Sequence, residues 1–193
     1  MSEKQSINNM LDRRGFLGAS GKLALSGTAI ALMGGVNTAF AGKTTSNNQL
    51  EQDVRILNTA IAAEHEAVAA YQLGAESGLL SEGVLKVALT FQGHHKEHID
   101  VLVDTVRKLG GQAVDAKDKY RFPVHKLKKQ SDVLMFAAGL ERGAVSAYAG
   151  AIPVFENSDL AKAAASILAD EAMHWAILRQ ALGLDPVPGA FFS

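Results

Sequence analysis

The chain has 193 residues, of which 48% are hydrophobic and 20% are charged, a composition typical of one globular domain with a short extension. Its 19 basic and 20 acidic residues nearly balance, so charge gives no basis for binding nucleic acid or an anionic membrane. Because the chain contains no cysteine, disulfides and thiolate chemistry are excluded, and any bound metal must have nitrogen and oxygen ligands.

Residues 1–41 have the pattern of an export signal. Arg13 and Arg14 precede a weakly apolar run that ends in a small-x-small sequence at residues 39–41. The paired arginines resemble the twin-arginine (Tat) signal, although Asp12 stands where that signal usually carries Ser or Thr. The sequence therefore predicts export to the periplasm or cell envelope, with cleavage at the end of this segment. A retained anchor is the weaker alternative, and no stable membrane span is expected after cleavage.

Four segments with helical periodicity follow a polar lead at residues 42–48, and we expect them to form one bundle over residues 49–183. They are predicted at about residues 49–77, 82–109, 131–156 and 158–182, followed by a C-terminal tail at residues 184–193. Ser131 with Asp132, and then Ser158, are predicted to cap the third and fourth helices. Pro153 is expected to kink or tighten the last turn of the third helix.

The lengths of the connections predict the topology. Short turns join the first helix to the second and the third to the fourth, so each pair should be antiparallel. The middle connection of about 20 residues can reach roughly 65 Å when extended. That exceeds the roughly 40 Å length of a helix of about 27 residues. The chain is therefore predicted to be an all-α antiparallel four-helix bundle with one long crossover between helices two and three.

The two helix pairs look like copies of one another. The sequence AEHEAVAAY at residues 63–71 aligns with LERGAVSAY at 140–148, and HKEHIDVL at 95–102 aligns with EAMHWAIL at 171–178. The alignment pairs Glu64 with Glu141, Tyr71 with Tyr148, His95 with Glu171, and His98 with His174. Two matches in the same order, at nearly the same spacing, indicate an internal duplication.

Six residues able to bind metal interrupt apolar seams that otherwise follow heptad spacing. They are Glu64, His95, His98, Glu141, Glu171 and His174. All lie near the middle of their helices, so they are expected to converge in the bundle core. Burying three carboxylates together is costly unless something compensates their charge. A divalent cation would do so, whereas a metal-free network of hydrogen bonds is the alternative.

On these residues the chain resembles the ferritin-like superfamily, and in particular Tat-exported ferritin-like domain proteins of bacteria, over residues 49–183. That superfamily takes a Glu from each of two helices and Glu-x-x-His from each of the other two. The resemblance implies that Glu64 and Glu141 are the single ligands and that Glu171 and His174 form one full motif. It also implies two ions of iron or manganese, and zinc would fit the same ligands.

The second helix departs from this pattern, because His95-x-x-His98 stands where Glu-x-x-His is expected. The change removes one of two carboxylates that normally bridge the metals, so a single ion or an asymmetric pair becomes an alternative. A rotated helix would present His94 and Glu97 instead and restore a carboxylate. Tyr71 and Tyr148 are interpreted as core residues that could also contact the ligands.

Two functions stay open at this point. The resemblance implies redox chemistry on Fe(II), oxygen or peroxide, as in ferroxidases, peroxidases or catalases, with no catalytic residue assigned beyond the metal ligands. The alternative is a non-catalytic metal-binding or stress-related envelope protein, which the missing carboxylate favours. Assembly into a homo-oligomer is compatible with both functions, and nothing in the sequence specifies it.

Overall fold

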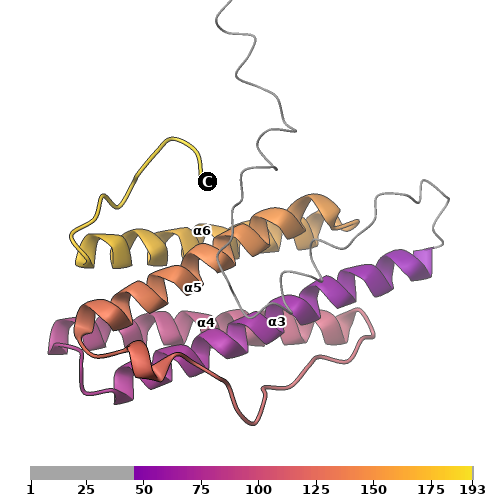
Figure 1. The fold of residues 1–193 in the computed structure, drawn as a ribbon. Helices are drawn as coiled ribbons and strands as arrows, with labels where there is room; N and C mark the ends of the chain where they lie inside the picture. The colour runs from indigo at the N-terminus through magenta and orange to yellow at the C-terminus, as the bar shows by residue number, and fades with distance from the viewer. Residues whose placement is uncertain (1–45, 193) are drawn as a thin grey trace, which may run out of the picture.

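The computed structural model describes residues 46–192, so the predicted export signal lies outside the described residues. The four long helices are α3 (Ser46–Glu76), α4 (Glu82–Lys108), α5 (Gln130–Ala151) and α6 (Ser158–Ala181). Two short 3-10 helices, η1 (Val124–Lys126) and η2 (Ile152–Val154), lie before and after α5. Residues 46–192 contain no strand, and the prediction of an all-α four-helix bundle is confirmed (Figure 1).

The helices are arranged as two pairs. α3 packs along α4 and α5 packs along α6, while α3 also contacts α5 across the bundle. The connection at residues 109–129 returns along the length of the bundle, so α4 and α5 run in the same direction (Figure 1). This is the predicted long crossover. None of the described helices is long and apolar enough to cross a membrane.

The start of α5 differs from its prediction. The helix begins at Gln130 and its N-cap is Lys129, so Ser131 already lies inside the first turn. The carboxylate of Asp132 accepts hydrogen bonds from the backbone N–H groups of Lys128 and Lys129, at 2.9 and 3.1 Å. Asp132 therefore satisfies the free N–H groups from within the first turn, which allows the helix to start earlier.

The junction between α5 and α6 also differs in detail. α5 ends at Ala151, and Pro153 lies in the tighter 3-10 helix η2 that follows, so the predicted tightening is confirmed. The cap of α6 is Asn157 rather than Ser158, because the Asn157 side chain accepts a hydrogen bond from the N–H of Asp159 at 2.9 Å. The first helix, α3, also differs from its prediction, because it begins at Ser46, three residues before the predicted start.

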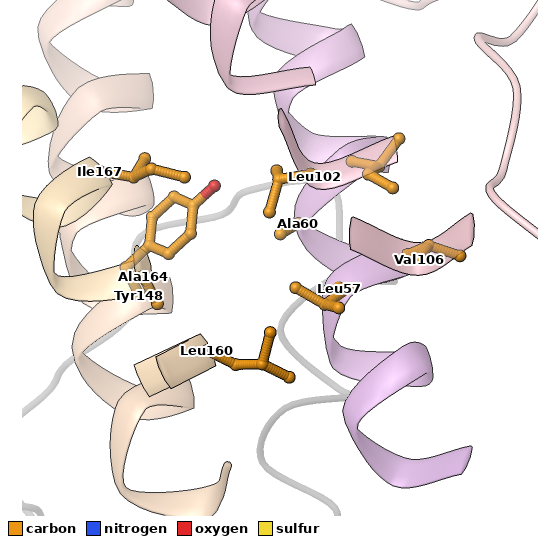
Figure 2. Close-up of a cluster of buried hydrophobic side chains, with 9 residues drawn as sticks. Leu57, Ala60, Leu102, Val106, Tyr148, Leu160, Ala164 and Ile167 are labelled. Atoms are coloured by element: carbon orange, nitrogen blue, oxygen red, sulfur yellow. The ribbon is translucent and has the colours of Figure 1, made fainter. Parts of the chain in front are cut away.

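The core consists of two apolar clusters separated by a polar layer. One cluster contains Leu57, Ala60, Ile61, Leu102, Val106, Tyr148, Leu160, Ala164 and Ile167 (Figure 2). The other contains Tyr71, Phe91, Leu134, Ala138 and Leu178. Along every long helix, the predicted polar positions lie between members of these two clusters. The bundle therefore holds its charged groups at mid-height, with apolar packing on both sides.

Candidate metal centre

The six residues predicted as metal ligands lie together at the middle of the bundle. Glu171 is 0% exposed, His95, Glu141 and His174 are each 1% exposed, and Glu64 is 3% exposed. His98 is the most accessible of the six, with 14% of its side chain exposed. Since water cannot solvate three buried carboxylates here, their charge must be balanced by the imidazoles or by a cation.

The six residues form two overlapping groups of four. Glu64, His95, His98 and Glu171 make one group, and His95, Glu141, Glu171 and His174 make the other. Within each group the donor atoms lie within 4.8 Å of one another. Opposite ligands of one ion are about 4–5 Å apart, because each bond is about 2.0–2.5 Å long. Each group could therefore hold one metal ion, and His95 and Glu171 belong to both.

Glu171 and His95 occupy equivalent positions in the duplicated halves but offer different geometry. Glu171 directs Oε1 toward Nδ1 of His98 at 3.2 Å and Oε2 toward Nδ1 of His174 at 3.7 Å, so its two oxygens serve the two groups. His95 lies with Nδ1 2.7 Å from Oε2 of Glu64 and Nε2 3.4 Å from Oε1 of Glu141. Because a neutral imidazole has one free lone pair, His95 cannot bridge as a carboxylate does.

Several buried atoms of the cluster have no hydrogen-bond partner within the described part of the chain. They are Nδ1 of His98, Nδ1 of His174, Oε2 of Glu141 and both carboxylate oxygens of Glu171. Buried polar atoms are nearly always paired, so five exceptions in one place require an explanation. All five are atoms that donate lone pairs to hard or borderline metals, and this donor set fits a divalent cation.

Two tyrosines orient the single-Glu carboxylates from the opposite helix. Tyr71 on α3 donates a hydrogen bond to Glu141 on α5, and Tyr148 on α5 donates to Oε1 of Glu64 on α3 at 2.6 Å. This reciprocal exchange follows the pairing of residues in the predicted duplication. Burial and the neighbouring carboxylates raise the pKa of both tyrosines well above 10, so both remain donors at neutral pH.

The imidazoles balance the carboxylates when no metal is bound. Burial alone would lower the pKa of His95, but its contacts with Glu141 and Glu64 raise the pKa to about 11. Burial also opposes the pKa shifts of the other two histidines. Contacts with Glu171 and Glu64 raise the pKa of His98 to about 9, and contacts with Glu141 and Glu171 raise the pKa of His174 to about 9. The metal-free cluster therefore holds imidazolium groups against carboxylates at neutral pH.

The sequence reasoning missed Asp170, which faces the outer nitrogens of two predicted ligands. Its Oδ2 lies 3.2 Å from Nε2 of His174 and 3.4 Å from Nε2 of His98. A carboxylate in this position fixes the orientation of each ring and, once the ring is neutral, favours the tautomer with the proton on Nε2 and the lone pair of Nδ1 toward the core. The spacing of four residues between Asp170 and His174, which places them on one helix face, was the available signal.

The rotated alternative for α4 is wrong. His95 is buried and His98 faces the cluster, whereas Glu97 is exposed to solvent. His94 does lie beside the cluster, but without any rotation of the helix. Its Nδ1 is 3.1 Å from Oδ2 of Asp170 and 2.9 Å from Nε2 of His174.

Two antiparallel helix pairs with a long crossover and a central layer of Glu and His define a ferritin-like bundle of the carboxylate–histidine class. The sequence pattern of the ferritin-like domain matches residues 52–184, and the chain belongs to this family.

Solved structures show the same fold. A conserved hypothetical protein from Mycobacterium tuberculosis is 22% identical, with a TM-score of 0.64, over 74% of this chain and 99% of that one. A ferritin-like, diiron-carboxylate protein from Bacillus anthracis str. Ames is 17% identical, with a TM-score of 0.61, over 69% of this chain and 97% of that one. The search of curated proteins found no match.

Proposed function

We propose that the protein binds two divalent metal ions, iron or manganese, in the Glu/His cluster and carries out redox chemistry on Fe(II), oxygen or peroxide. The observation that carries the proposal is the set of five buried, unpartnered donor atoms within two overlapping groups of ligands. Without a metal, these atoms have no hydrogen bonds within residues 46–192, and the contacts of Glu171 with Nδ1 of His98 and of His174, at 3.2 and 3.7 Å, are ion pairs alone. The diiron-carboxylate description of the Bacillus anthracis protein agrees with this choice of metal.

The ligands divide between two ions in this proposal. Glu64 and His98 would hold one ion, Glu141 and His174 the other, and Glu171 would bridge them. His95 would bind only one of the two, which makes the pair asymmetric. When bound, such ions supply Lewis acidity and one-electron redox steps.

The surrounding residues would prepare the centre for that chemistry. Tyr71 and Tyr148 hold the carboxylates of Glu141 and Glu64 through hydrogen bonds, while the flanking apolar clusters exclude bulk water. An apolar cavity of about 90 Å³ extends to Tyr71 and is also lined by Val84 and Leu134. Because the lining of this cavity is almost entirely apolar, it suits a small apolar oxidant such as dioxygen.

The second candidate is a metal-binding or stress-related envelope protein without turnover. Two observations favour it. The ligands shared by both groups, His95 and Glu171, are 1% and 0% exposed, so the centre is closed, and His95 replaces a bridging carboxylate. A closed site holds its ion against solvent but restricts the access of a substrate.

Elemental analysis of the purified protein tests the metal proposal, followed by assays with Fe(II) and oxygen and with peroxide. We expect two metal ions per chain, and their loss in a His95→Ala/His174→Ala variant and in Glu171→Ala. Glu97→Ala, which removes an exposed carboxylate from the same helix as His95, is the matched control. Metal without turnover would support the non-catalytic candidate, and absence of metal from the intact protein would refute both.

We also propose export to the periplasm or cell envelope through residues 1–41. The support is the sequence pattern around Arg13 and Arg14. Cell fractionation and N-terminal sequencing of the mature protein test it, with an Arg13→Lys/Arg14→Lys variant as the comparison. Retention of that variant in the cytoplasm is expected, whereas equal export of both proteins would contradict a twin-arginine route.

A further inference from the structure

A third group of potential ligands lies at the solvent edge of the centre. It consists of His94, Asp170 and His174. Nδ1 of His94 is 2.9 Å from Nε2 of His174 and 3.1 Å from Oδ2 of Asp170, and Oδ2 of Asp170 is 3.2 Å from Nε2 of His174. The His94 side chain is 39% exposed and the Asp170 side chain 23% exposed, so this outer group is open to water, unlike the inner groups.

Hydrogen bonds cannot satisfy this triangle of three atoms. If both imidazoles donate to Asp170, two N–H groups face each other between His94 and His174. If one imidazole donates and the other does not, two lone pairs face each other along a remaining edge. A cation at the centre of the triangle meets three lone pairs at once, and the conflict disappears.

The size of the triangle also fits a metal ion. Adjacent ligands about 2.0–2.1 Å from an ion are separated by about 2.9–3.4 Å at octahedral or tetrahedral angles. The three observed separations of 2.9, 3.1 and 3.2 Å all fall in this range. Two imidazoles and a carboxylate are a common donor set for divalent transition metals, and water can complete the coordination on the exposed side.

We propose that His94, Asp170 and Nε2 of His174 form an outer divalent-cation site that loads the inner centre. The inference rests on the proposed metal binding by the inner groups. His174 connects the two sites, because its Nδ1 faces Glu171 and Glu141 while its Nε2 faces the outer group. His174 carries a proton on each nitrogen in the metal-free protein, so binding of the outer ion at Nε2 would release that proton to solvent. Nδ1 would become free for the inner ion only after the outer ion leaves Nε2 and the remaining proton moves from Nδ1 to Nε2.

The loading role predicts a kinetic effect that is separate from the final metal content. Metal-free full-length protein is mixed with cobalt(II), a probe with visible absorption, and uptake is followed by stopped flow. His94→Ala should load at least tenfold more slowly than the unchanged protein at low cobalt concentration and reach the same final content. His125→Ala, which removes an exposed histidine that belongs to none of the three groups, should load at the unchanged rate. Loading of His94→Ala at the unchanged rate would overturn the proposal.

A second variant separates the outer site from the inner centre. Glu64→Gln/Glu141→Gln weakens both inner groups and leaves the outer three residues in place. This variant should bind one cobalt ion per chain, and adding His94→Ala should abolish that binding. Binding that persists without His94, or no binding to the double variant while its helical circular dichroism is unchanged, would refute the outer site. The protein without substitutions could instead bind only one ion, and His94→Ala could abolish that binding. This result would refute the proposed inner centre and support the outer site.

Discussion

The charge balance inside the metal-free bundle predicts that its stability falls as the pH rises above neutrality. His98 and His174 are held as imidazolium groups by the buried carboxylates around them, and the pKa of each is about 9. In the unfolded chain these histidines titrate near 6.5. Raising the pH from 6.5 to 9 therefore removes protons from the folded state that the unfolded state has already lost, so folding becomes less favourable.

The size of this effect follows from the pKa values. A rise from 6.5 to about 9 corresponds to about 3 kcal/mol for one histidine, fully present below pH 6.5 and lost as the pH rises through 9. Because both imidazoles share the Glu171 carboxylate, their contributions are not additive. We therefore expect His98 and His174 together to lose at least about 3 kcal/mol between pH 6.5 and 9, and His95, whose pKa is about 11, adds to the loss in the same direction. This is a large part of the roughly 5–15 kcal/mol that stabilises a typical domain.

Urea unfolding followed by circular dichroism measures this directly, with chelator-treated protein at several pH values between 6.5 and 9. Metal-loaded protein is the control, because its imidazoles are neutral ligands and have no proton to lose over this range. The midpoint for the metal-free protein should fall with pH, and the midpoint for the loaded protein should stay level or rise. A level midpoint for the metal-free protein would refute the assignment of imidazolium groups to the cluster.

Three further substitutions test individual contacts. Asp170→Asn keeps the size of the side chain but removes the charge that faces His98 and His174. Metal affinity, measured by competition with a chelator, should fall about 10–100-fold. Unchanged affinity would show that Asp170 does not act on the ligands. Tyr148→Phe leaves Oε1 of Glu64 without its donor, which should lower the free energy of unfolding by about 1–3 kcal/mol in urea titrations. Gly139→Ala should raise it by about 0.5–1 kcal/mol, because Gly139 lies inside α5 and an added Cβ meets no atom within 4 Å; a loss of stability would mean that the position is more crowded than the structure indicates.

Hydrophobic periodicity was sufficient to predict the fold and the inward face of each helix. In α6, Ala164, Ile167 and Leu178 recur at heptad spacing, and all three are buried together with the two polar residues on the same face. One buried face per helix, two short turns and one long connection leave few alternative packings. For the same reason the convergence of the six polar residues could be inferred before any distance was known.

Details that depend on single hydrogen bonds could not be inferred in this way. Asp132 and Ser131 are both good capping residues, and only the backbone geometry decides which side chain reaches a free N–H group. The role of Asp170 was missed for a similar reason. Periodicity places it beside the buried face of α6, but it does not show that the outer nitrogens of two histidines point toward it.

The internal duplication is preserved in the outer contacts of the centre and broken in its middle. Tyr71 and Tyr148 exchange hydrogen bonds with Glu141 and Glu64 across the bundle, as two copies of one helix pair should. At the shared position one copy has Glu171 and the other has His95. With a second glutamate there, four buried carboxylates would face only the two imidazolium groups of His98 and His174, and a metal ion would be needed for charge balance. With His95 as an imidazolium, three carboxylates and three imidazoles balance without metal. Histidine at position 95 therefore stabilises the folded protein before it binds metal, but it leaves the centre with one bridging carboxylate, Glu171, instead of two.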